Sequence, residues 1–431
     1  MQIYVIKPGD NLWRISNLYN ISPERLIEAN RIPNPNNLVV GQTIVIPIQG
    51  MYHFVQPGES LFSISSMYGI SPQELARING IADPNLIRPG LRLYIPQVER
   101  PDIYTAAYID LALSKERAQE IVSEVGPFLT YLNVFSYPIR RDGTLQPVDD
   151  QAALQAAKNN RVLPIMVVTN FEEGTFKTEI ATAIFTDEAL QDKLLNEILS
   201  VMQEKGYAGV DFDLEYLGRE NRERYVAFLQ KAVDKFRPLG YEVSVALAPK
   251  LSEDQQGVLY EGHDYRAIGE VVDYVNIMTY EWGWSGGPPM PVAPINEVSR
   301  VMDFAVSQIP SDKIMMGIPL YGYDWRLPYE RGGQWARALS PQRAVALAAQ
   351  VGAAILFDEK SQSPYFHYYD SSGNRHEVWF EDARSVQAKF DLVKEYGLRG
   401  LYYWVLGNEF PQNWLLLNDN FNIIKEERPL Q

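Results

Sequence analysis

The stretch YAGVDFDLEY, from Tyr207 to Tyr216, limits the possible folds of this chain more than any other segment. Three carboxylates, Asp211, Asp213 and Glu215, occupy every second position, with apolar residues between them. Because alternate side chains of a β-strand point to the same face, this strand has one acidic face and one apolar face. The apolar face has to be buried. The acidic face is either solvated on an open sheet or enclosed in a barrel.

Enclosure of these carboxylates would have a chemical consequence. At this spacing the acids crowd one another, so at least one keeps its proton near neutral pH, and a protonated glutamate can act as a general acid. A divalent-cation site is the rival interpretation, because three acids could bind a metal ion. No His or Asn joins them at ligand spacing, and the four histidines, at 53, 263, 367 and 376, are scattered. We therefore expect structural or surface histidines, no metal site and no cofactor.

From residue 101 onward the chain alternates short apolar strands with amphipathic helices. The expected strands are Tyr104 to Tyr108, Tyr131 to Phe135, Val162 to Val168, Gly209 to Asp213, Glu242 to Ala246, Tyr274 to Met278, Met315 to Ile318 and Gly400 to Trp404. The expected helices include Ser114 to Val125, Asp187 to Lys205, Arg219 to Phe236, Ile295 to Gln308 and Asp382 to Tyr396. Eight strands with helical crossovers predict an α/β fold, a parallel (β/α)8 barrel with its site at the carboxyl ends of the strands. The carboxylate strand is the fourth.

One interval, at about residues 322–381, breaks this rhythm between the seventh strand and the helix that follows it. It contains FDEKSQSPYFHYYDSSGNRHEVWF, whose alternation on both sides of Ser-Ser-Gly-Asn predicts a hairpin. A connection of this length should fold on its own. We expect a small α+β insertion that forms a wall over the barrel mouth.

The first 97 residues contain a sequence that is repeated at an offset of 49 residues, so that Pro8 and Gly9 match Pro57 and Gly58. Each copy, 1–48 and 50–97, has a strand, a PGD or PGE turn, two short helices and a strand that ends in Ile-Pro. Two βααβ modules are therefore expected, joined to the barrel domain at 101–431 by a short connection at 97–101. On this organisation, deleting residues 1–97 should spare the cleavage of small soluble substrates.

Charge and composition restrict the partners. A formal net charge of -15 argues against nucleic acid or an anionic membrane surface, because both require a basic protein surface. The 26 Tyr and 8 Trp are compatible with binding of neutral carbohydrate. Without cysteine, neither disulfides nor thiolate chemistry is available. The N-terminal sequence has no recognisable signal peptide, and no apolar run is long enough to span a bilayer.

The two repeats resemble the LysM module in three features: L-x-x-I-S after the turn, Asn at the end of the second helix, and G-Q/L-x-I/L-x-I-P at the close. The resemblance implies binding of N-acetylglucosamine-containing chains such as peptidoglycan or chitin, in a groove between the first turn and the loop after the second helix. The residues implied are Gly9, Asp10, Leu12, Asn30 and Ile32 in the first repeat and Gly58, Glu59, Leu61, Asn79 and Ile81 in the second. A duplicated structural unit without a ligand is the alternative.

The segment 101–431 resembles the family 18 glycoside hydrolases, whose fourth strand carries D-x-x-D-x-D-x-E. The last three acids of that motif match Asp211, Asp213 and Glu215. The MTY segment of the sixth strand, GIPLYGYDW at 317–325 and the late GLRGLYYWVLG also fit. Three features depart from the pattern: Ala208 replaces the first Asp, Glu281 stands where Asp commonly follows the Tyr, and VLPIMVVTNF lacks Ser-x-Gly-Gly.

The resemblance also implies roles for individual residues. Glu215 is implied as the acid that protonates the leaving oxygen and then activates water. Asp213, which would share a proton with Asp211, is implied to orient the 2-acetamido group of the substrate, whose own oxygen attacks the anomeric carbon. Tyr280 would donate a hydrogen bond to the acetamido oxygen, and Trp404 would stack beneath the sugar. Further implied substrate-binding residues are Met278, Glu281, Tyr321 and Asn170.

Tandem LysM modules joined directly to such a barrel resemble the spore cortex-lytic N-acetylglucosaminidases of endospore formers. This resemblance implies a retaining enzyme that cleaves β-1,4 bonds after N-acetylglucosamine in peptidoglycan or cortex fragments, as a monomer in the coat or cortex region of the spore. A chitinase with the same chemistry on a homopolymer, and an inactive glycan-binding coat protein, are the alternatives.

Overall fold

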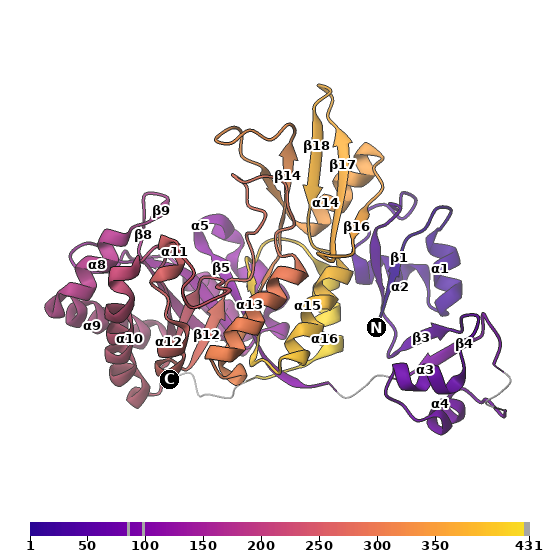
Figure 1. Ribbon diagram of the computed structural model, residues 1–431, viewed down its shortest axis with the longest axis horizontal. Helices are drawn as coiled ribbons and strands as arrows, with labels where there is room; N and C mark the ends of the chain where they lie inside the picture. Colours follow the sequence, from indigo (N-terminus) through magenta and orange to yellow (C-terminus); the bar gives the residue numbers. More distant parts are fainter. Residues whose placement is uncertain (84–86, 97–99, 426–431) are drawn as a thin grey trace.

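A computed structural model of the protein describes residues 1–83, 87–96 and 100–425. Two small repeats lie at one end of the molecule, the barrel lies beside them, and a β-rich insertion stands above (Figure 1). The expected connection at 97–101 lies largely outside the described residues. The predicted domain ends at 97 and 431 lie outside them as well.

Both repeats have the expected βααβ order, with the two strands of each paired antiparallel. Ser22 and Ser71, at equivalent positions, cap the second helices, each with a proline at the first helical position. The elements of the first repeat are β1 (Gln2–Val5), α1 (Leu12–Tyr19), α2 (Pro23–Asn30) and β2 (Thr43–Ile46). Those of the second are β3 (Met51–Phe54), α3 (Leu61–Met67), α4 (Pro72–Ile78) and β4 (Arg92–Ile95).

The barrel is closed, because its parallel strands run β5-β6-β7-β10-β11-β12-β13-β19 and β19 pairs with β5. The strands are β5 (Asp102–Asp110), β6 (Tyr131–Pro138), β7 (Leu163–Thr169), β10 (Gly209–Asp213), β11 (Glu242–Leu247), β12 (Tyr274–Ile277), β13 (Ile314–Pro319) and β19 (Gly400–Trp404). A short strand, β20 (Asn422–Ile423), adds to the other side of β5. The predicted (β/α)8 barrel is confirmed, with the carboxylate strand β10 as its fourth strand.

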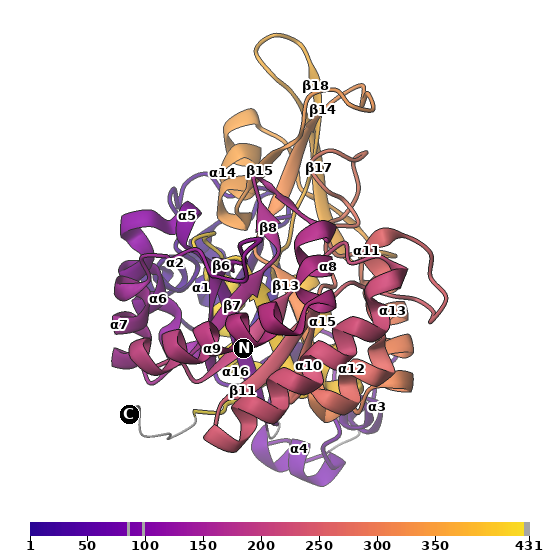
Figure 2. The ribbon, with the colours of Figure 1, turned by 90° about the vertical axis from the view of Figure 1, so that its left-hand side faces the viewer.

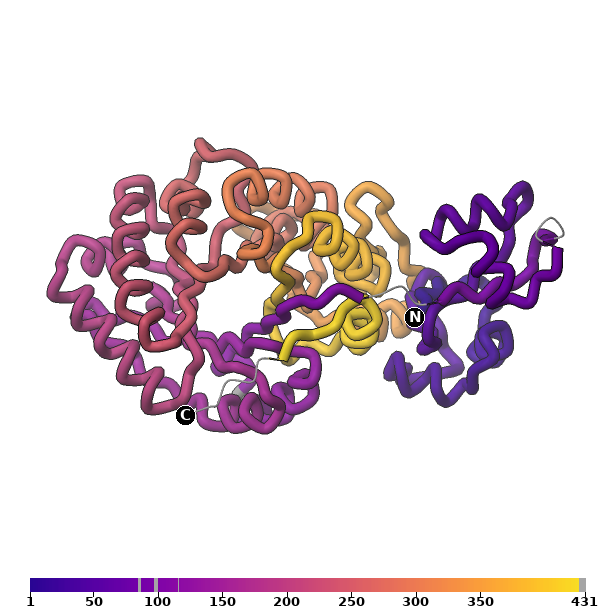
Figure 3. Tube along the Cα trace, turned by 90° about the horizontal axis from the view of Figure 1, so that it is seen from below, coloured from indigo at the N-terminus to yellow at the C-terminus, as the bar shows by residue number. Residues whose placement is uncertain are grey.

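Helices surround these strands (Figure 3), each burying an apolar stripe against them. They are α6 (Ala118–Val125), α7 (Gln151–Asn159), α8 (Thr178–Thr186), α9 (Glu188–Lys205), α10 (Arg222–Phe236), α12 (Tyr265–Val271), α13 (Ile295–Gln308), α15 (Ala383–Glu395) and α16 (Pro411–Asn420). Shorter elements near the loops are α5 (Leu111–Ser114), α11 (Val258–Glu261) and the hairpin β8 (Phe171–Glu172) with β9 (Thr175–Phe176). The apolar core lies between the helices and strands, and a second, smaller core fills the barrel interior.

The insertion follows β13 and precedes α15, as expected. It is a five-stranded antiparallel sheet, in the order β15-β14-β18-β17-β16, with one helix packed on it. Its elements are β14 (Gly322–Arg326), β15 (Arg337–Leu339), α14 (Pro341–Val351), β16 (Leu356–Asp358), β17 (Ser363–Tyr369) and β18 (Arg375–Trp379). The predicted hairpin is β17 with β18. Because the insertion leaves the carboxyl end of β13, it rises on the side of the barrel where the site is expected (Figures 1 and 2).

The first repeat packs directly against the barrel domain and its insertion. Val39 belongs to the apolar core of the insertion, Val45 belongs to the core of the barrel, and the Ile355 N–H donates to the Val40 carbonyl at 2.8 Å. The second repeat contacts the first, where the Gln2 side chain pairs with both backbone polar groups of Tyr52 at 2.9 and 3.0 Å. The first repeat is thus part of the same folded body as the barrel and its insertion.

Candidate active site

Asp211 lies fully buried inside the barrel, and its carboxylate accepts three hydrogen bonds. Tyr108 Oη donates to Oδ2 at 2.6 Å, while Ser244 Oγ and Asn276 Nδ2 donate to Oδ1 at 2.6 and 3.1 Å. Burial raises the pKa of Asp211, and these three donors act in the opposite direction. These hydrogen bonds favour the ionised form and so limit the rise, and any negative charge on Asp211 raises the pKa of the next acid of the strand.

Asp213 has no such set of partners. Its Oδ1 atom is buried and accepts no hydrogen bond from the described residues. Burial, the charge of Glu215 and the charge of Asp211, in that order, raise the pKa of Asp213 well above its ordinary value. Asp213 is therefore a carboxyl group that holds a proton readily and has a free oxygen for a ligand.

Glu215 follows at the mouth of the barrel, half-buried, two residues after β10 ends. Burial raises its pKa to about 7, which makes it a proton donor near neutral pH. Asn170, which follows β7, contacts the Glu215 backbone and not its carboxylate. The Glu215 N–H donates to Asn170 Oδ1 at 3.0 Å, and Asn170 Nδ2 donates to the Glu215 carbonyl at 2.9 Å. The Asn170 amide thus supports the backbone of the acid, and its sugar contact stays a prediction.

Two aromatic residues complete the floor of the site. The Tyr280 hydroxyl lies 3.1 Å from the Tyr402 hydroxyl, and both rings belong to the inner core of the barrel. Gly317 makes this approach possible, since a Cβ there would lie 2.8 Å from Tyr280 Cε1 and 2.9 Å from the Tyr402 hydroxyl. Trp404 packs edge-on against Tyr108 and Phe135 at 5.6 and 5.0 Å, which holds its indole at the end of β19.

Glu281 and Tyr321, predicted to bind substrate, bind each other. Tyr321 Oη donates to Glu281 Oε1, and Tyr323 Oη donates to the same oxygen at 2.9 Å. Glu281 therefore links the loop after β12 to the first strand of the insertion. Met278 lies half-buried in that loop, where its N–H donates to the Leu247 carbonyl at 2.9 Å.

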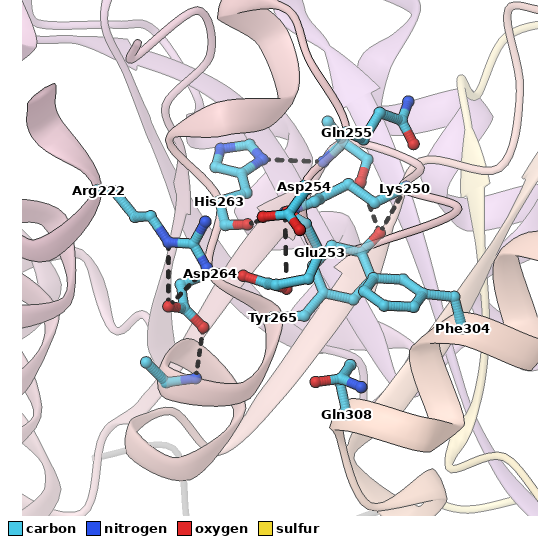
Figure 4. Close-up of polar contacts among 12 residues, drawn as sticks. Arg222, Lys250, Glu253, Asp254, Gln255, His263, Asp264, Tyr265, Phe304 and Gln308 are labelled. Atoms are coloured by element: carbon cyan, nitrogen blue, oxygen red, sulfur yellow. Dashed lines mark hydrogen bonds and ion pairs between the residues drawn. The ribbon is translucent and has the colours of Figure 1, made fainter. Parts of the chain in front are cut away.

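A buried polar cluster lies behind β10, on the loop between β11 and α12 (Figure 4). His263 is fully buried; its Nδ1 accepts from the Ala248 N–H at 3.0 Å, so its Nε2 donates to the Leu214 carbonyl at 3.1 Å. Burial lowers the pKa of His263 to about 4, and it lowers that of Lys250 to about 8. Lys250 Nζ donates to the His263 carbonyl at 3.0 Å. The cluster thus fixes the residue that precedes Glu215.

Most of the implied LysM residues hold the modules together. The Asn30 amide is buried and bonds to the backbone of Leu26 and Val45, and Asn79 makes the same bonds in its own module. Leu12, Leu61 and Ile32 are core residues, and Ile81 packs against the second core. Asp10 and Glu59 accept from the backbone N–H groups of Lys7 and Gln56 and so close their turns. Both amide hydrogens of Asn30 and of Asn79 are thus donated within the module, and a sugar contact by either residue stays a prediction.

Gly9 and Gly58 form an open surface at the two turns, where a Cβ would have no atom of the described part of the chain within 4 Å. Next to them, one position after the buried leucine of each repeat, Trp13 and Phe62 are 69% and 71% exposed. We had not selected these aromatic residues from the sequence, although they occupy equivalent positions of the repeat. A search for large apolar residues on the polar side of each short helix would have found them.

Sequence reasoning also missed other candidate site residues. Ser244 and Asn276 are polar residues in otherwise apolar strands. A polar side chain on the inward face of a barrel strand was the sequence signal that could have identified them. Trp284 and Trp335, from the loop after β12 and from the insertion, are exposed and lie edge to face at 6.0 Å. No local sequence pattern predicts the contact between these two tryptophans. Among the described residues, no group of three or more His, Cys, Asp or Glu side chains could hold a metal ion.

The arrangement is suited to acid catalysis on a sugar. A proton donor with a pKa near 7 lies next to a second carboxyl group, which has an oxygen that accepts no hydrogen bond from the described residues. Tyr280 and Trp404 lie at the carboxyl ends of two other barrel strands, β12 and β19. Across the described helices, none is both long and apolar enough to cross a membrane.

Comparison with known proteins gives matches to both parts of the chain. The family described as glycosyl hydrolases family 18 matches residues 107–409, and the LysM domain matches residues 4–47 and 53–96. The cortical fragment-lytic enzyme of Bacillus subtilis is 52% identical over 99% of both chains. That of Bacillus anthracis is 45% identical over 99% of this chain and 100% of its own. The crystal structure of the spore cortex-lytic enzyme SleL of Bacillus megaterium superposes with a TM-score of 0.91, at 44% identity over 99% of both chains.

Proposed function

Because the chain belongs to the glycoside hydrolases of family 18 and carries two LysM domains, we propose that it is an N-acetylglucosaminidase that degrades peptidoglycan fragments of the spore cortex. The substrate is inferred from relatives that are similar along their whole length and are described as cortical fragment-lytic enzymes. The bond proposed is the β-1,4 linkage that follows N-acetylglucosamine.

The observation that carries this proposal is the difference between the three carboxyl groups of one strand. Asp211 accepts three hydrogen bonds, Asp213 has a buried oxygen that accepts none from the residues the structure describes, and burial raises the pKa of Glu215 to about 7. A reaction that uses the 2-acetamido oxygen of the substrate as nucleophile needs a proton donor and a group that orients the acetamide, but no enzymic nucleophile. Glu215 and Asp213 fit these two roles.

In the proposed mechanism, Glu215 donates its proton to the leaving glycosidic oxygen as the acetamido oxygen attacks the anomeric carbon. Asp213 accepts the acetamido N–H at its free Oδ1 and so turns the carbonyl oxygen toward that carbon. Tyr280 supports the acetamido oxygen, and the Trp404 indole supports the apolar face of the sugar. Glu215, now ionised, then takes a proton from water, which opens the cyclic intermediate with retention.

Binding to insoluble glycan is proposed for the two LysM domains, through the open turns at Gly9 and Gly58 and the adjacent Trp13 and Phe62. Each domain raises the effective concentration of the catalytic site along the polymer. The first repeat can bind glycan and pack against the barrel domain at the same time. It packs through Val39 and Val45, whereas the glycan is proposed to bind at the turn of Gly9. Localisation in the coat or cortex region of the spore is part of the same proposal.

The test is digestion of purified cortex fragments by the full chain, followed by mass analysis of the products. We expect fragments with N-acetylglucosamine at the reducing end, and a kcat/KM that falls as pH rises through about 7 because Glu215 loses its proton. Glu215→Gln should lower turnover by a factor on the order of 10³ or more while binding to the fragments persists.

Three outcomes would contradict the proposal. Products that end in muramic acid would place the cleavage on the other side of each sugar pair. Equal turnover of chito-oligosaccharides and cortex fragments would favour the chitinase alternative, and near wild-type turnover by Glu215→Gln would remove Glu215 from the acid role.

A further inference from the structure

The backbone around Glu215 is not held by the strand that carries it. β10 ends at Asp213, and its pairing with β7 ends with Asp213 opposite Thr169. Tyr216, the residue after the acid, has a φ of 54°, which a residue with a side chain adopts at a cost in energy. Contacts outside the sheet therefore have to fix this segment.

Three side chains from three other segments take over this task. The consecutive carbonyl groups of Leu214, Glu215 and Tyr216 accept from His263, Asn170 and Thr178 respectively. His263 and Thr178 each make one of these bonds. Asn170 makes two, because it also accepts from the Glu215 N–H, so it binds both backbone polar groups of the acid.

Asn170 is itself rigid. Its side chain is fully buried, and its second amide hydrogen is donated to the Lys177 carbonyl at 3.0 Å. The Lys177 N–H donates in return to the Asn170 carbonyl at 2.9 Å. With its amide bonded at both ends, Asn170 connects the end of β7, the start of α8 and the backbone of Glu215.

We propose that Asn170 is the positioning residue of Glu215: by pairing with both backbone groups of the acid, its amide fixes the direction in which the Glu215 carboxyl group points. This inference rests on the proposed role of Glu215 as proton donor. An amide is suited to the task because it offers one acceptor and one donor in the same plane. A carboxylate lacks the donor, and a hydroxyl group is too short to reach both positions.

The first test compares Asn170→Ala with the wild type on soluble cortex fragments. The alanine variant loses both bonds, and a misplacement of about 1 Å costs on the order of 10²-fold in rate. We expect kcat to fall by about 10- to 100-fold, with KM changed by less than about threefold because Asn170 contacts the acid and not the sugar. An equal loss in kcat and rise in KM would point to a sugar contact and would overturn the inference.

Asn170→Asp gives a readout that a loss of stability alone would not produce. When protonated, the Asp side chain can still accept from the Glu215 N–H and donate to one carbonyl group. When ionised, its second oxygen faces the carbonyl oxygens of Glu215 and Lys177. We therefore expect kcat near that of the wild type at acidic pH and a loss as pH rises, whereas Asn170→Ala stays low at every pH. The pH profile of wild-type kcat is the reference, because the titration of Glu215, Asp213 and His263 contributes to it as well.

Asn221 offers a matched control. It is equally buried and its Nδ2 atom donates to the Leu217 carbonyl at 2.8 Å and to Thr182 Oγ1 at 2.7 Å, two residues beyond the acid. Asn221→Ala should lower stability but not kcat, once the variants are compared at the same folded fraction. If Asn170→Ala keeps wild-type kcat, or if both variants lower kcat alike, Asn170 has no positioning role. Activity in Glu215→Gln would instead overturn the proposed function, so the two failures are distinguishable.

Discussion

At the scale of single residues, the site depends on one carboxyl group that is hard to ionise. Burial raises the pKa of Glu215 from 4.5 to about 7, so the folded protein binds more protons than the unfolded chain between these two values. The stability that this group contributes is present at low pH and is lost as pH rises through about 7. A catalytic acid of this kind is therefore a cost to the folded state at the pH where it works.

This cost predicts the effect of Glu215→Gln on stability. The amide cannot ionise, so at about pH 8 the variant should be more stable than the wild type by about 1–3 kcal/mol, and at about pH 4 the difference should vanish. Chemical denaturation at both pH values measures it. His263 titrates in the opposite sense, because its lowered pKa of about 4 removes stability as pH falls below 6.5. His263 is present in both proteins, so its contribution cancels from the difference in stability. An equal stabilisation by Glu215→Gln at both pH values would contradict this prediction.

At the scale of secondary-structure elements, the short helices α1 and α3 show what the repeat preserves. Each begins with a buried leucine, Leu12 or Leu61, which anchors it to its module, and the next residue is an exposed aromatic. Exposing a large apolar side chain to water is unfavourable, and a ligand that covers it would gain the free energy of burying that surface. The same arrangement in both repeats indicates a common purpose.

We therefore predict that Phe62→Ala weakens the retention of the enzyme on insoluble peptidoglycan by about 0.5–1.5 kcal/mol, and that adding Trp13→Ala weakens it further. Co-sedimentation at several polymer concentrations measures the effect, and turnover of soluble fragments should not change. Leu113→Ala is the control, because Leu113 is 71% exposed on α5 of the catalytic domain. Retention that responds equally to all three substitutions would mean that general hydrophobicity, and not these helices, binds the polymer.

At the scale of the whole molecule, the two repeats are unequal partners of the barrel. Gly41 of the first repeat lies against the insertion, where a Cβ would be 1.8 Å from the Ile355 carbonyl oxygen. At Gly90, its equivalent 49 residues later, a Cβ would meet no atom of the described residues within 4 Å, and the two glycines have nearly the same φ, 84° and 86°. Because Val39 and Val45 complete cores of the catalytic domain, deleting residues 1–97 should destabilise that domain, contrary to the expectation from sequence that cleavage would be spared.

This pair of glycines supplies a matched experiment. Gly41→Ala and Gly90→Ala impose the same backbone strain, of about 1 kcal/mol, but only the first forces the repeat away from the insertion. We expect Gly41→Ala to lower the melting temperature of the catalytic domain by several degrees more than Gly90→Ala does, and to expose the segment 31–42 to limited proteolysis. Equal effects of the two substitutions would mean that the first repeat does not support the barrel.

The sequence by itself determined what depends on neighbours along the chain. Alternation through Asp211, Asp213 and Glu215 predicted a strand with its acids on one face, and the 49-residue repeat predicted two βααβ modules, because strand and helix periods are local properties. Only the tertiary structure decided that Asn170 holds the backbone of Glu215, 45 residues away, and that Val39 packs beside Ile355. Such contacts join residues that are far apart in the sequence and form only when the chain folds, so no local sequence pattern predicts them. For the same reason the sequence could not show that the Asn30 and Asn170 amides bond to the protein's own backbone, and their sugar contacts stay predictions.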